Sequence, residues 1–330
     1  MSRAAKEGSR LALVGDIGGT NARFGLVDLD AERLVVTAAA RYRVKDHANA
    51  AAAVQLYLRE QGLTCALAGA AVAVAGPVTN GAIDFTNSNW TLSEAELRSL
   101  GFGSARLLND YAALAIAAPI LEGDDLRMIG EGGQGLANRT IAIIGPGTGF
   151  GVSALARDDH GAATVTTEGG HVSFAPTDDV EIEILRLLAR RYGRVSVERI
   201  LSGAGLHDLH QCLQAIEGRP TTDDDPAEIT RRALADDPEC LRTVERFCAI
   251  LGSVAGDFAL SFGALGGVYI AGGIPPLIIS VLERSAFRQR FEAKGRFGDY
   301  LRGIPTPVIM RPHVALLGAA QSIRTLLKDQ

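Results

Sequence analysis

Two glycine-rich turns are the first places in this sequence where residue type and spacing predict chemistry. The stretch GDIGGT runs from Gly15 to Thr20 between two apolar segments, and GPGTGFG fills 145–151 in a similar setting. Glycine lets backbone N–H groups approach a ligand closely, and successive N–H groups in a tight turn bind anions. Plain hairpin turns could carry the same glycines. The threonines in matched places, Thr20 and Thr148, and the acid of the first turn favour a pair of phosphate-binding loops.

Asp16 is the acid of the first turn, and its carboxylate would repel a phosphate unless a cation stood between them. Mg²⁺ takes oxygen ligands and usually keeps several waters, so Asp16 is expected to hold it through water. The first turn lacks the GxGxxG of a dinucleotide-binding fold, and an apolar strand rather than a helix follows it. The sequence also contains no GxxxxGKS/T phosphate loop.

Carboxylates and amides gather at other segment ends. Asn109 and Asp110 close an apolar strand where a helix begins, so Asp110 could accept a proton from a substrate hydroxyl while Asn109 holds a neighbouring one. Alternatively, Asp110 is only the N-cap of that helix. Glu168 and His171 flank a Gly-Gly pair, and Glu198 follows. This set suits sugar hydroxyls, although a Glu-x-x-His pair could be half of a metal site.

Composition excludes several other classes of protein. The 330 residues are 47% hydrophobic and 22% charged, with a formal net charge of −5 and no basic run, so no nucleic-acid partner is expected. The arginine cluster at 186–194 lies in an amphipathic helical pattern and is interpreted as a solvated face. Four cysteines without a CxxC pair indicate a reduced, cytoplasmic chain without structural zinc. No secretory leader or membrane-spanning run is apparent.

The elements that must position these residues form two approximate copies of one α/β plan. A strand, a glycine turn, a second strand and a third strand are predicted over 11–44, and the same series recurs over 140–167. A buried strand within 65–78 and another within 266–276 belong to the two copies. Helices are predicted at 48–61, 93–101, 178–192, across most of 196–263, and at 313–327. Two such lobes predict a ligand-binding cleft between them.

At this level of detail the chain resembles bacterial ATP-dependent glucokinases of the hexokinase/actin-like ATPase superfamily, over about 11–327. The resemblance implies a two-lobed actin-like ATPase (ribonuclease H-like) α/β fold with an inter-domain cleft. It also implies a small domain of 10–119 plus 312–330 and a large domain of 120–311 with a helical insertion. The matching motifs, in family order, are GDIGGTNARF (15–24), FTNSNW (85–90), LLNDYAALA (107–115), IGPGTGFG (144–151), TEGGHVSFAP (167–176), VSVERILSGAGL (195–206) and IAGGIPP (270–276).

The resemblance implies a role for each matched residue in phosphorylating the 6-hydroxyl of D-glucose with ATP and Mg²⁺, the first step of glycolysis. Asp110 corresponds to the catalytic base, and Asp16 to the residue that steers Mg²⁺. Sugar contacts correspond to Asn87, Asn109, Glu168, His171 and Glu198. Phosphate and adenosine contacts correspond to Gly15, Asp16, Ile17, Gly18, Gly19, Thr20, Gly145, Gly147, Thr148, Gly149, Gly272 and Gly273. The resemblance is compatible with a homodimer.

One departure and two alternatives refine this interpretation. ROK sugar kinases and repressors carry a cysteine-rich zinc motif near their catalytic histidine, whereas His171 is followed by VSFAPTD. This favours the non-ROK glucokinase branch. A kinase for another hexose, such as mannose, fructose or N-acetylmannosamine, stays open because the orientation of one hydroxyl depends on pocket geometry. A non-catalytic sugar sensor of the same fold is the second alternative, which the presence of Asp110 disfavours.

Overall fold

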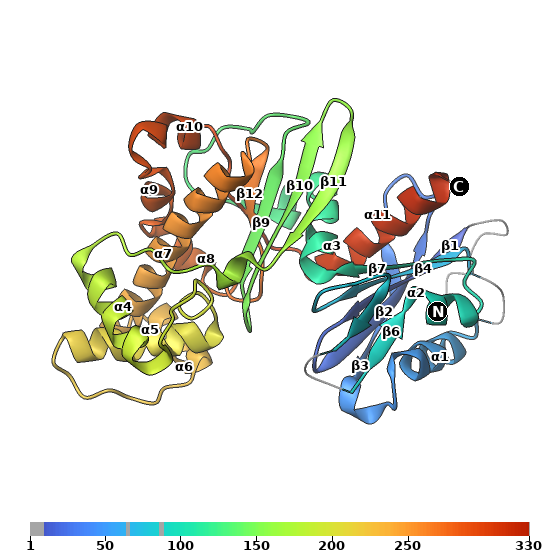
Figure 1. The fold of residues 1–330 in the computed structure, drawn as a ribbon, viewed down its shortest axis with the longest axis horizontal. Coiled ribbons are helices and arrows are strands. Elements are labelled where there is room, and N and C mark those ends of the chain that lie inside the picture. The colour runs from blue at the N-terminus through green and yellow to red at the C-terminus, as the bar shows by residue number, and fades with distance from the viewer. Residues whose placement is uncertain (1–9, 64–66, 86–88, 330) are drawn as a thin grey trace. The chain divides into compact units, whose positions relative to one another are not determined.

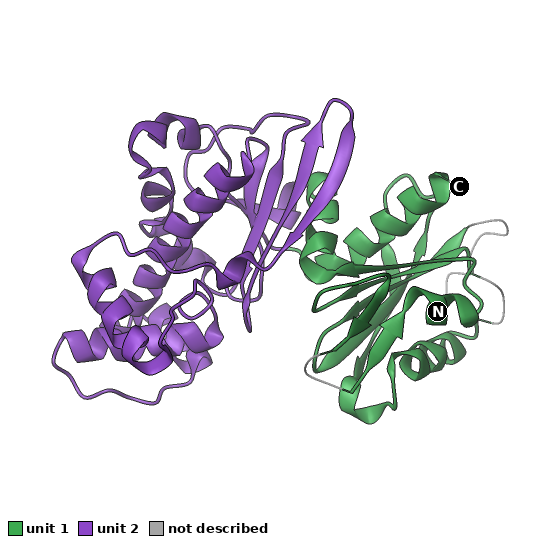
Figure 2. Cartoon of the chain, viewed as in Figure 1, with its two compact units in different colours: residues 1–121, 311–330 green, residues 122–310 purple. Residues whose placement is uncertain are grey.

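The chain divides into two compact units, each described here by itself. The computed structural model describes residues 10–63, 67–85 and 89–329. Unit 1 consists of residues 1–121 and 311–330, and unit 2 of residues 122–310 (Figure 2). The last segment of the chain therefore belongs to the same unit as the first. Among the described helices, none combines the length and apolar character that a membrane span requires.

Unit 1 is built on a sheet with the strand order β3-β2-β1-β4-β7. Strands β1, β2 and β3 form an antiparallel meander, whereas β4 and β7 run parallel to β1. Because the parallel strands are in register at Ile17, Val74 and Asn109, their carboxyl ends meet at one edge of the sheet. The strands are β1 (Leu11–Ile17), β2 (Asn21–Asp28), β3 (Val36–Arg43), β4 (Gly69–Val74) and β7 (Ser104–Asn109).

Helices cover both faces of this sheet (Figure 1). Helices α3 (Asp110–Ala117) and α11 (Val314–Lys328) pack together on one face, over β1, β4 and β7. A Cβ added at Gly318 of α11 would lie 1.9 Å from the carbonyl oxygen of Ala113, so glycine permits this close helix contact. On the opposite face lie α1 (Ala50–Glu60), α2 (Glu94–Ser99) and the short hairpin of β5 (Ala82–Asp84) and β6 (Thr91–Ser93).

Unit 2 repeats the plan with the strand order β11-β10-β9-β12-β13-β8. Strands β9, β10 and β11 form the antiparallel meander, and β12 and β13 run parallel to β9. The parallel strands are in register at Ile144, Ile270 and Val308. The strands are β8 (Leu126–Met128), β9 (Ile141–Pro146), β10 (Phe150–Asp158), β11 (Gly161–Thr167), β12 (Gly267–Ile270) and β13 (Pro307–Ile309).

The helices of unit 2 pack around the long, mostly buried α7 (Figure 1). This helix contacts β9 and β12 of the sheet as well as α5, α6 and α9. Phe247, Leu251 and Val254 of α7 belong to the apolar core of the unit. The helices are α4 (Asp179–Tyr192), α5 (Gly203–Ile216), α6 (Pro226–Leu234), α7 (Pro238–Phe262), α8 (Ile279–Arg284), α9 (Phe287–Glu292) and α10 (Gly298–Arg302).

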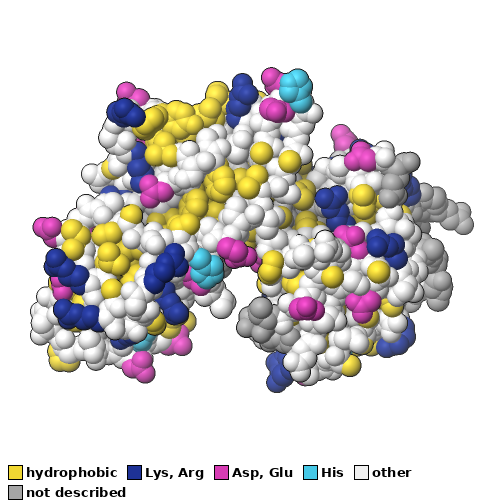
Figure 3. Space-filling model, in the orientation of Figure 1, with side chains coloured by type: hydrophobic (Ala, Val, Ile, Leu, Met, Phe, Trp, Pro, Cys, Tyr) yellow, Lys and Arg dark blue, Asp and Glu magenta, His cyan; other side chains and the backbone are white. Residues whose placement is uncertain are grey.

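The surface follows the balanced composition. The chain has 33 lysines and arginines against 38 aspartates and glutamates, and on the face drawn in Figure 3 the two signs are interspersed over each unit. Several of these charges form ion pairs within the same helix. Examples are Arg186 with Glu183 on one helix and Arg231 with Glu228 on another. Such exposed pairs contribute little to stability and mainly favour solvation.

Candidate functional site

The first glycine turn lies at the carboxyl edge of the unit 1 sheet. It follows β1, and the N–H of Gly18 closes it by donating to the carbonyl of Asn21 at 2.9 Å. The N–H of Ala75, just past β4, donates to the carbonyl of Ile17 at 3.0 Å. Thr20 is exposed at the tip of the turn, and its carbonyl accepts from Val44. The turn is thus held from both sides while its exposed tip faces solvent.

Asp16 sits on β1 directly opposite Arg23 of β2. The guanidinium of Arg23 lies 3.6 Å from the carboxylate of Asp16, whose side chain is 22% exposed. Burial raises the pKa of Asp16, while the positive charges of Arg23 and His313 act in the opposite direction. The ion pair with Arg23 is long, at 3.6 Å, so the carboxylate of Asp16 could still accept from the water shell of a hydrated Mg²⁺. Gly15 precedes Asp16 and is tightly packed, since an added Cβ would lie 3.0 Å from the side chain of Val72.

Asn109 and Asp110 reach the same edge at the end of β7. The Oδ1 of Asn109 accepts from the N–H groups of Tyr111 (3.0 Å) and Ala112 (3.2 Å), and its Nδ2 donates to the carbonyl of Gly76 at 3.2 Å. Asn109 is therefore the N-cap of α3, and the alternative that Asp110 is the cap is wrong. Asp110 is the first helical residue, and the Tyr111 N–H also lies 2.9 Å from its Oδ1. The side-chain amide of Asn109 retains a second N–H that could meet a substrate hydroxyl.

The second glycine turn lies at the corresponding edge of the unit 2 sheet. The Gly147 N–H donates to the carbonyl of Gly149 at 2.8 Å. The segment after β12 crosses this turn, because an added Cβ at Gly145 would lie 2.2 Å from the Ala271 oxygen. Gly272, at a φ of +90°, would likewise bring a Cβ 2.2 Å from the Pro146 oxygen. Glycine is required at both positions by backbone contact, and the segments 145–149 and 272–273 lie against each other.

The N-terminus of α5 adds a feature that the sequence interpretation missed. The Gly203 N–H donates to the carbonyl of Gly147 at 2.9 Å, and the Ser202 hydroxyl caps the helix by accepting from Gly205 at 3.0 Å. The positive end of the helix dipole therefore abuts the second glycine turn, where it favours an anion. The signal was available in SGAGL, since serine before the first residues of an apolar-periodic helix is a typical N-cap.

Glu168, His171 and Glu198 belong to one backbone framework of unit 2. A 3₁₀ helix, Gly169–His171, follows β11, and the Glu198 N–H donates to the carbonyl of Gly170 at 3.0 Å. The Oε2 of Glu198 accepts from the Phe150 N–H at 2.9 Å, which ties this carboxylate to the end of the glycine turn. Glu168 and His171 are exposed and Glu198 is half-buried. The arrangement offers carboxylate acceptors and an imidazole to a polyhydroxylated ligand.

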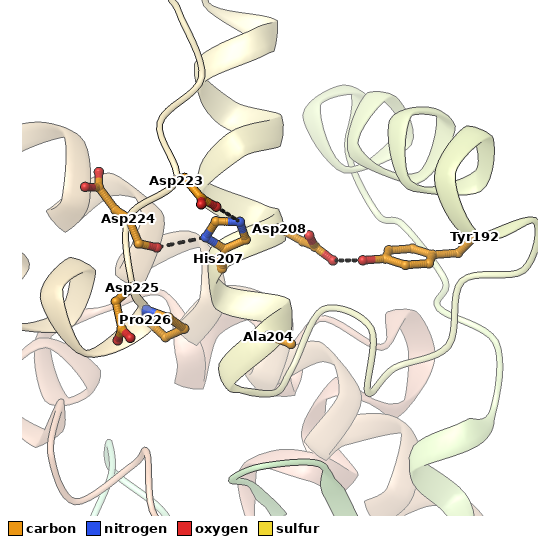
Figure 4. Close-up of a pocket in the computed structure, with 8 residues that line it drawn as sticks. All are labelled: Tyr192, Ala204, His207, Asp208, Asp223, Asp224, Asp225 and Pro226. Carbon is orange, nitrogen blue, oxygen red and sulfur yellow. Dashed lines mark hydrogen bonds and ion pairs between the residues drawn. The ribbon is translucent and has the colours of Figure 1, made fainter.

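A pocket of about 700 Å³ opens one turn along α5 (Figure 4). Its wall contains Asp208, which accepts from the Tyr192 hydroxyl at 2.7 Å, and His207, whose Nδ1 lies 2.8 Å from the carbonyl oxygen of Asp224. The carboxylates disfavour phosphate and favour a ligand with hydroxyl or amino donors. The full lining is Tyr192, Ala204, His207, Asp208, Asp223, Asp224, Asp225 and Pro226.

The remaining predicted residues are placed as follows. Gly19 is partly exposed on the first turn, Thr148 is exposed on the second, and a Cβ added at Gly273 would meet nothing within 4 Å. Asn87 lies outside the described residues. The structure thus groups the predicted residues into two sets, one at the carboxyl edge of each sheet.

Two α/β units whose sheets share the order of five strands, each with a glycine turn between the first two strands of its antiparallel meander, define an actin-like ATPase fold of the sugar-kinase type. A crystal structure of a glucokinase from Balamuthia mandrillaris in complex with glucose shares this fold at a TM-score of 0.78, with 18% identity over 98% of this chain and 95% of that one.

Closer comparisons define the family. The family model for glucokinase matches residues 13–326. A glucokinase of Caulobacter sp. (strain K31) is 55% identical over 94% of each chain. The crystal structure of a glucokinase from an Antarctic psychrotroph aligns at a TM-score of 0.89 and 35% identity, over 96% of this chain and 99% of that one. The chain belongs to the glucokinase family and is an enzyme.

Proposed function

We propose that this protein transfers the γ-phosphoryl group of ATP to the 6-hydroxyl of D-glucose, giving glucose 6-phosphate and ADP. The observation that carries the proposal is the grouping at the two sheet edges. In unit 1 the Asp16–Thr20 turn and Asp110 share one edge. In unit 2 the second glycine turn is joined through Phe150 to Glu198 of the sugar set. Family membership supports the same reaction.

Asp110 is proposed as the general base. In phosphoryl transfer the bond from O6 to the γ-phosphorus forms as the bond to the β–γ bridging oxygen breaks, and positioning does most of the catalytic work. Asp110 would orient the 6-hydroxyl for in-line attack and accept its proton late in the reaction. Its place at the start of α3 supports this role, because the Asn109 cap fixes the end of the strand that carries it. General-base assistance is typically worth ~10²–10⁴-fold.

Mg²⁺ is the proposed metal, and Asp16 the residue that holds it through water. The donor set fits, because a partly exposed carboxylate beside a phosphate-type turn is an oxygen ligand of the kind that Mg²⁺ prefers. The ion would offset the charge of the transferring group. The Asp16–Thr20 and 145–149 turns are proposed to contact the phosphates, with Gly272 and Gly273 at the adenosine. The Gly18 and Gly147 N–H groups close these turns internally, so the Gly19 and Gly149 N–H groups are the ones proposed to donate to phosphate oxygens.

Glucose is proposed to bind Asn109, Glu168, His171 and Glu198, together with Asn87. Glu198 has one oxygen occupied by the Phe150 N–H, so its other oxygen is the one proposed to accept from a sugar hydroxyl. Through the same residue the sugar contact is coupled to the glycine turn that would hold the donor.

Three further properties belong to the proposal. The absence of cysteine from VSFAPTD after His171 supports the non-ROK branch. A cytoplasmic location is supported by Cys212, Cys240 and Cys248, which are buried and unpaired among the described residues. A homodimer is proposed from the family alone, and light scattering after gel filtration would test it.

A coupled assay of ADP release with ATP, Mg²⁺ and a panel of hexoses tests the function. We expect strong preference for glucose over mannose, fructose and N-acetylmannosamine. Turnover on a different hexose would support the role of Asp110 as the base and contradict the assignment of the residues that bind glucose. Folded protein that binds ATP but turns over none of the sugars would contradict the kinase proposal.

A further inference from the structure

Arg194 departs from the arginine cluster to which its sequence assigns it. The cluster at 186–194 is interpreted as a solvated face, and Arg186, Arg190 and Arg194 are all exposed; what distinguishes Arg194 is its hydrogen-bond partner. Arg194 lies beyond the end of that helix, after Gly193. Its Nη2 donates to the carbonyl oxygen of His171 at 2.5 Å and lies 3.4 Å from the Ser173 hydroxyl. An arginine of a solvent-facing group thus holds the backbone of a residue in the proposed sugar site.

The surrounding backbone leaves the His171 carbonyl available to Arg194. Residues 170–174 pair with 195–198 as a short ribbon. The N–H groups of Val197 and Glu198 donate to the carbonyls of Val172 and Gly170, both at 3.0 Å. The carbonyls of Gly170 and Val172, on either side of His171, therefore accept hydrogen bonds within the ribbon. The His171 carbonyl instead accepts from Arg194, the residue just before the partner segment.

The far end of the segment is fixed independently. Glu181 of α4, whose side chain is 1% exposed, accepts from Arg290 at 2.7 Å and from Arg246 at 3.2 Å, and Thr177 donates to the same carboxylate. This buried network holds the fold around 177–181 whether or not Arg194 is present. Removal of Arg194 should therefore act on His171 and leave the stability of the unit largely unchanged.

We propose that Arg194 is a positioning residue for glucose binding. The peptide between His171 and Val172 is held on one side by the Val172 N–H, which donates to the Gly169 carbonyl at 3.2 Å, and on the other by the Arg194 guanidinium at the His171 carbonyl. We infer that this second hold sets where the imidazole meets the sugar. The hydrogen bond is charge-assisted and short, hence stronger than a neutral one. A displacement of a binding group by about 1 Å is enough to weaken a site. This inference rests on the proposed function, because it takes His171 as a sugar contact.

The test compares Arg194→Met, which keeps the apolar stem and removes the donors, with Arg194→Lys, which keeps one donor. The matched control is Arg190→Met, which removes an equal charge from the exposed face of α4. We expect Arg194→Met to raise the KM for glucose about five- to tenfold, with kcat and the KM for ATP within about twofold. Arg194→Lys should recover part of the loss, and the control should match wild type. Melting temperatures should agree.

A double-mutant cycle isolates the path through His171. In a His171→Ala background, Arg194→Met should change kcat/KM for glucose by less than about twofold, because the group that it positions is gone. An unchanged glucose KM in Arg194→Met, or equal rises in both KM values with a lower melting temperature, would overturn the inference. Wild-type enzyme that fails to phosphorylate glucose would overturn the proposed function instead, so the two failures are distinguishable.

Discussion

The sheets of units 1 and 2 share the order of five strands, yet the first glycine of each turn is packed in a different way. In unit 1 the turn contains Asp16, and a Cβ added at Gly15 would meet the side chain of Val72 at 3.0 Å. In unit 2 the turn carries no acid, and a Cβ added at Gly145 would meet the backbone oxygen of Ala271 at 2.2 Å. The same backbone plan therefore carries different charges in the two units. The turn of unit 1 has a carboxylate that suits a cation, whereas the turn of unit 2 has N–H groups and a helix N-terminus that suit an anion.

The largest effect on kcat is expected at Asp110, where the carboxyl edges of the two sheets carry different residue types. Asp110 follows β7, and after β13, the strand in the corresponding place of the unit 2 sheet, stand Met310 and Arg311 rather than an acid. Asp110→Asn should fold, bind glucose and lose ~10²–10⁴-fold in kcat, because the proton acceptor is removed. Steady-state kinetics and glucose titration measure this, with Asp46→Asn as the control at an exposed site of unit 1. Near-full kcat in Asp110→Asn would mean that the base lies elsewhere.

The second prediction tests whether glycine is needed for stability or for ATP binding at Gly145 and at Gly18. Gly145→Ala would place a Cβ 2.2 Å from the Ala271 oxygen, so the backbone must shift, at a cost of about 1–3 kcal/mol in unfolding free energy. Gly18→Ala meets no such contact and should melt like wild type while raising the KM for ATP. Thermal unfolding and ATP kinetics of both variants supply the comparison. Equal stability of the two variants would show that the turns are packed alike.

The smallest effect is expected on the free energy of unfolding, from the N-cap of a helix in each unit. Asp237 caps α7 by accepting from Glu239 (3.1 Å) and Cys240 (3.0 Å), whereas α11 starts at His313 without a side-chain cap. The Cys240 N–H bond and Arg232 lower the pKa of Asp237 from its ordinary 3.8 to about 2. Asp237→Ala should cost about 1 kcal/mol at neutral pH.

The pH dependence of that cost follows from the direction of the shift. Because the folded pKa lies below the unfolded one, the contribution of Asp237 is complete above about pH 4 and is lost as the pH falls towards 2. The difference in unfolding free energy between wild type and Asp237→Ala should therefore narrow between pH 5 and pH 3 in urea titrations. A difference that stays constant over this range would exclude the carboxylate as its source.

The long elements of the fold were predictable, and the short ones were not. The apolar runs around each glycine turn identify β1 and β2 as well as β9 and β10, because each of these strands has six or more residues to display its pattern. The three-residue strands β8 and β13 carry too few residues for any periodicity. The predicted third strand at 33–44 is β3, Val36–Arg43, since turns and bends occupy the residues before it.

The site was predictable in residue type and less so in contacts. Asparagine and aspartate both cap helices, so sequence alone could not decide between Asn109 and Asp110. The need for glycine at Gly145 arises from Ala271, which is remote in sequence. The contact of Arg194 with His171 likewise depends on a ribbon between segments that no local pattern pairs. The roles assigned to these residues in catalysis and binding stay predictions.

The return of α11 to unit 1 has a consequence for the order in which the chain folds during synthesis. Unit 2 is one uninterrupted stretch, whereas unit 1 lacks α11, one of the two helices on that face of its sheet, until residues 311–330 have left the ribosome. Domains usually fold in the order in which they are translated. Here the later-translated unit is the first that can be completed, and the earlier sheet has only α3 on this face until α11 is made.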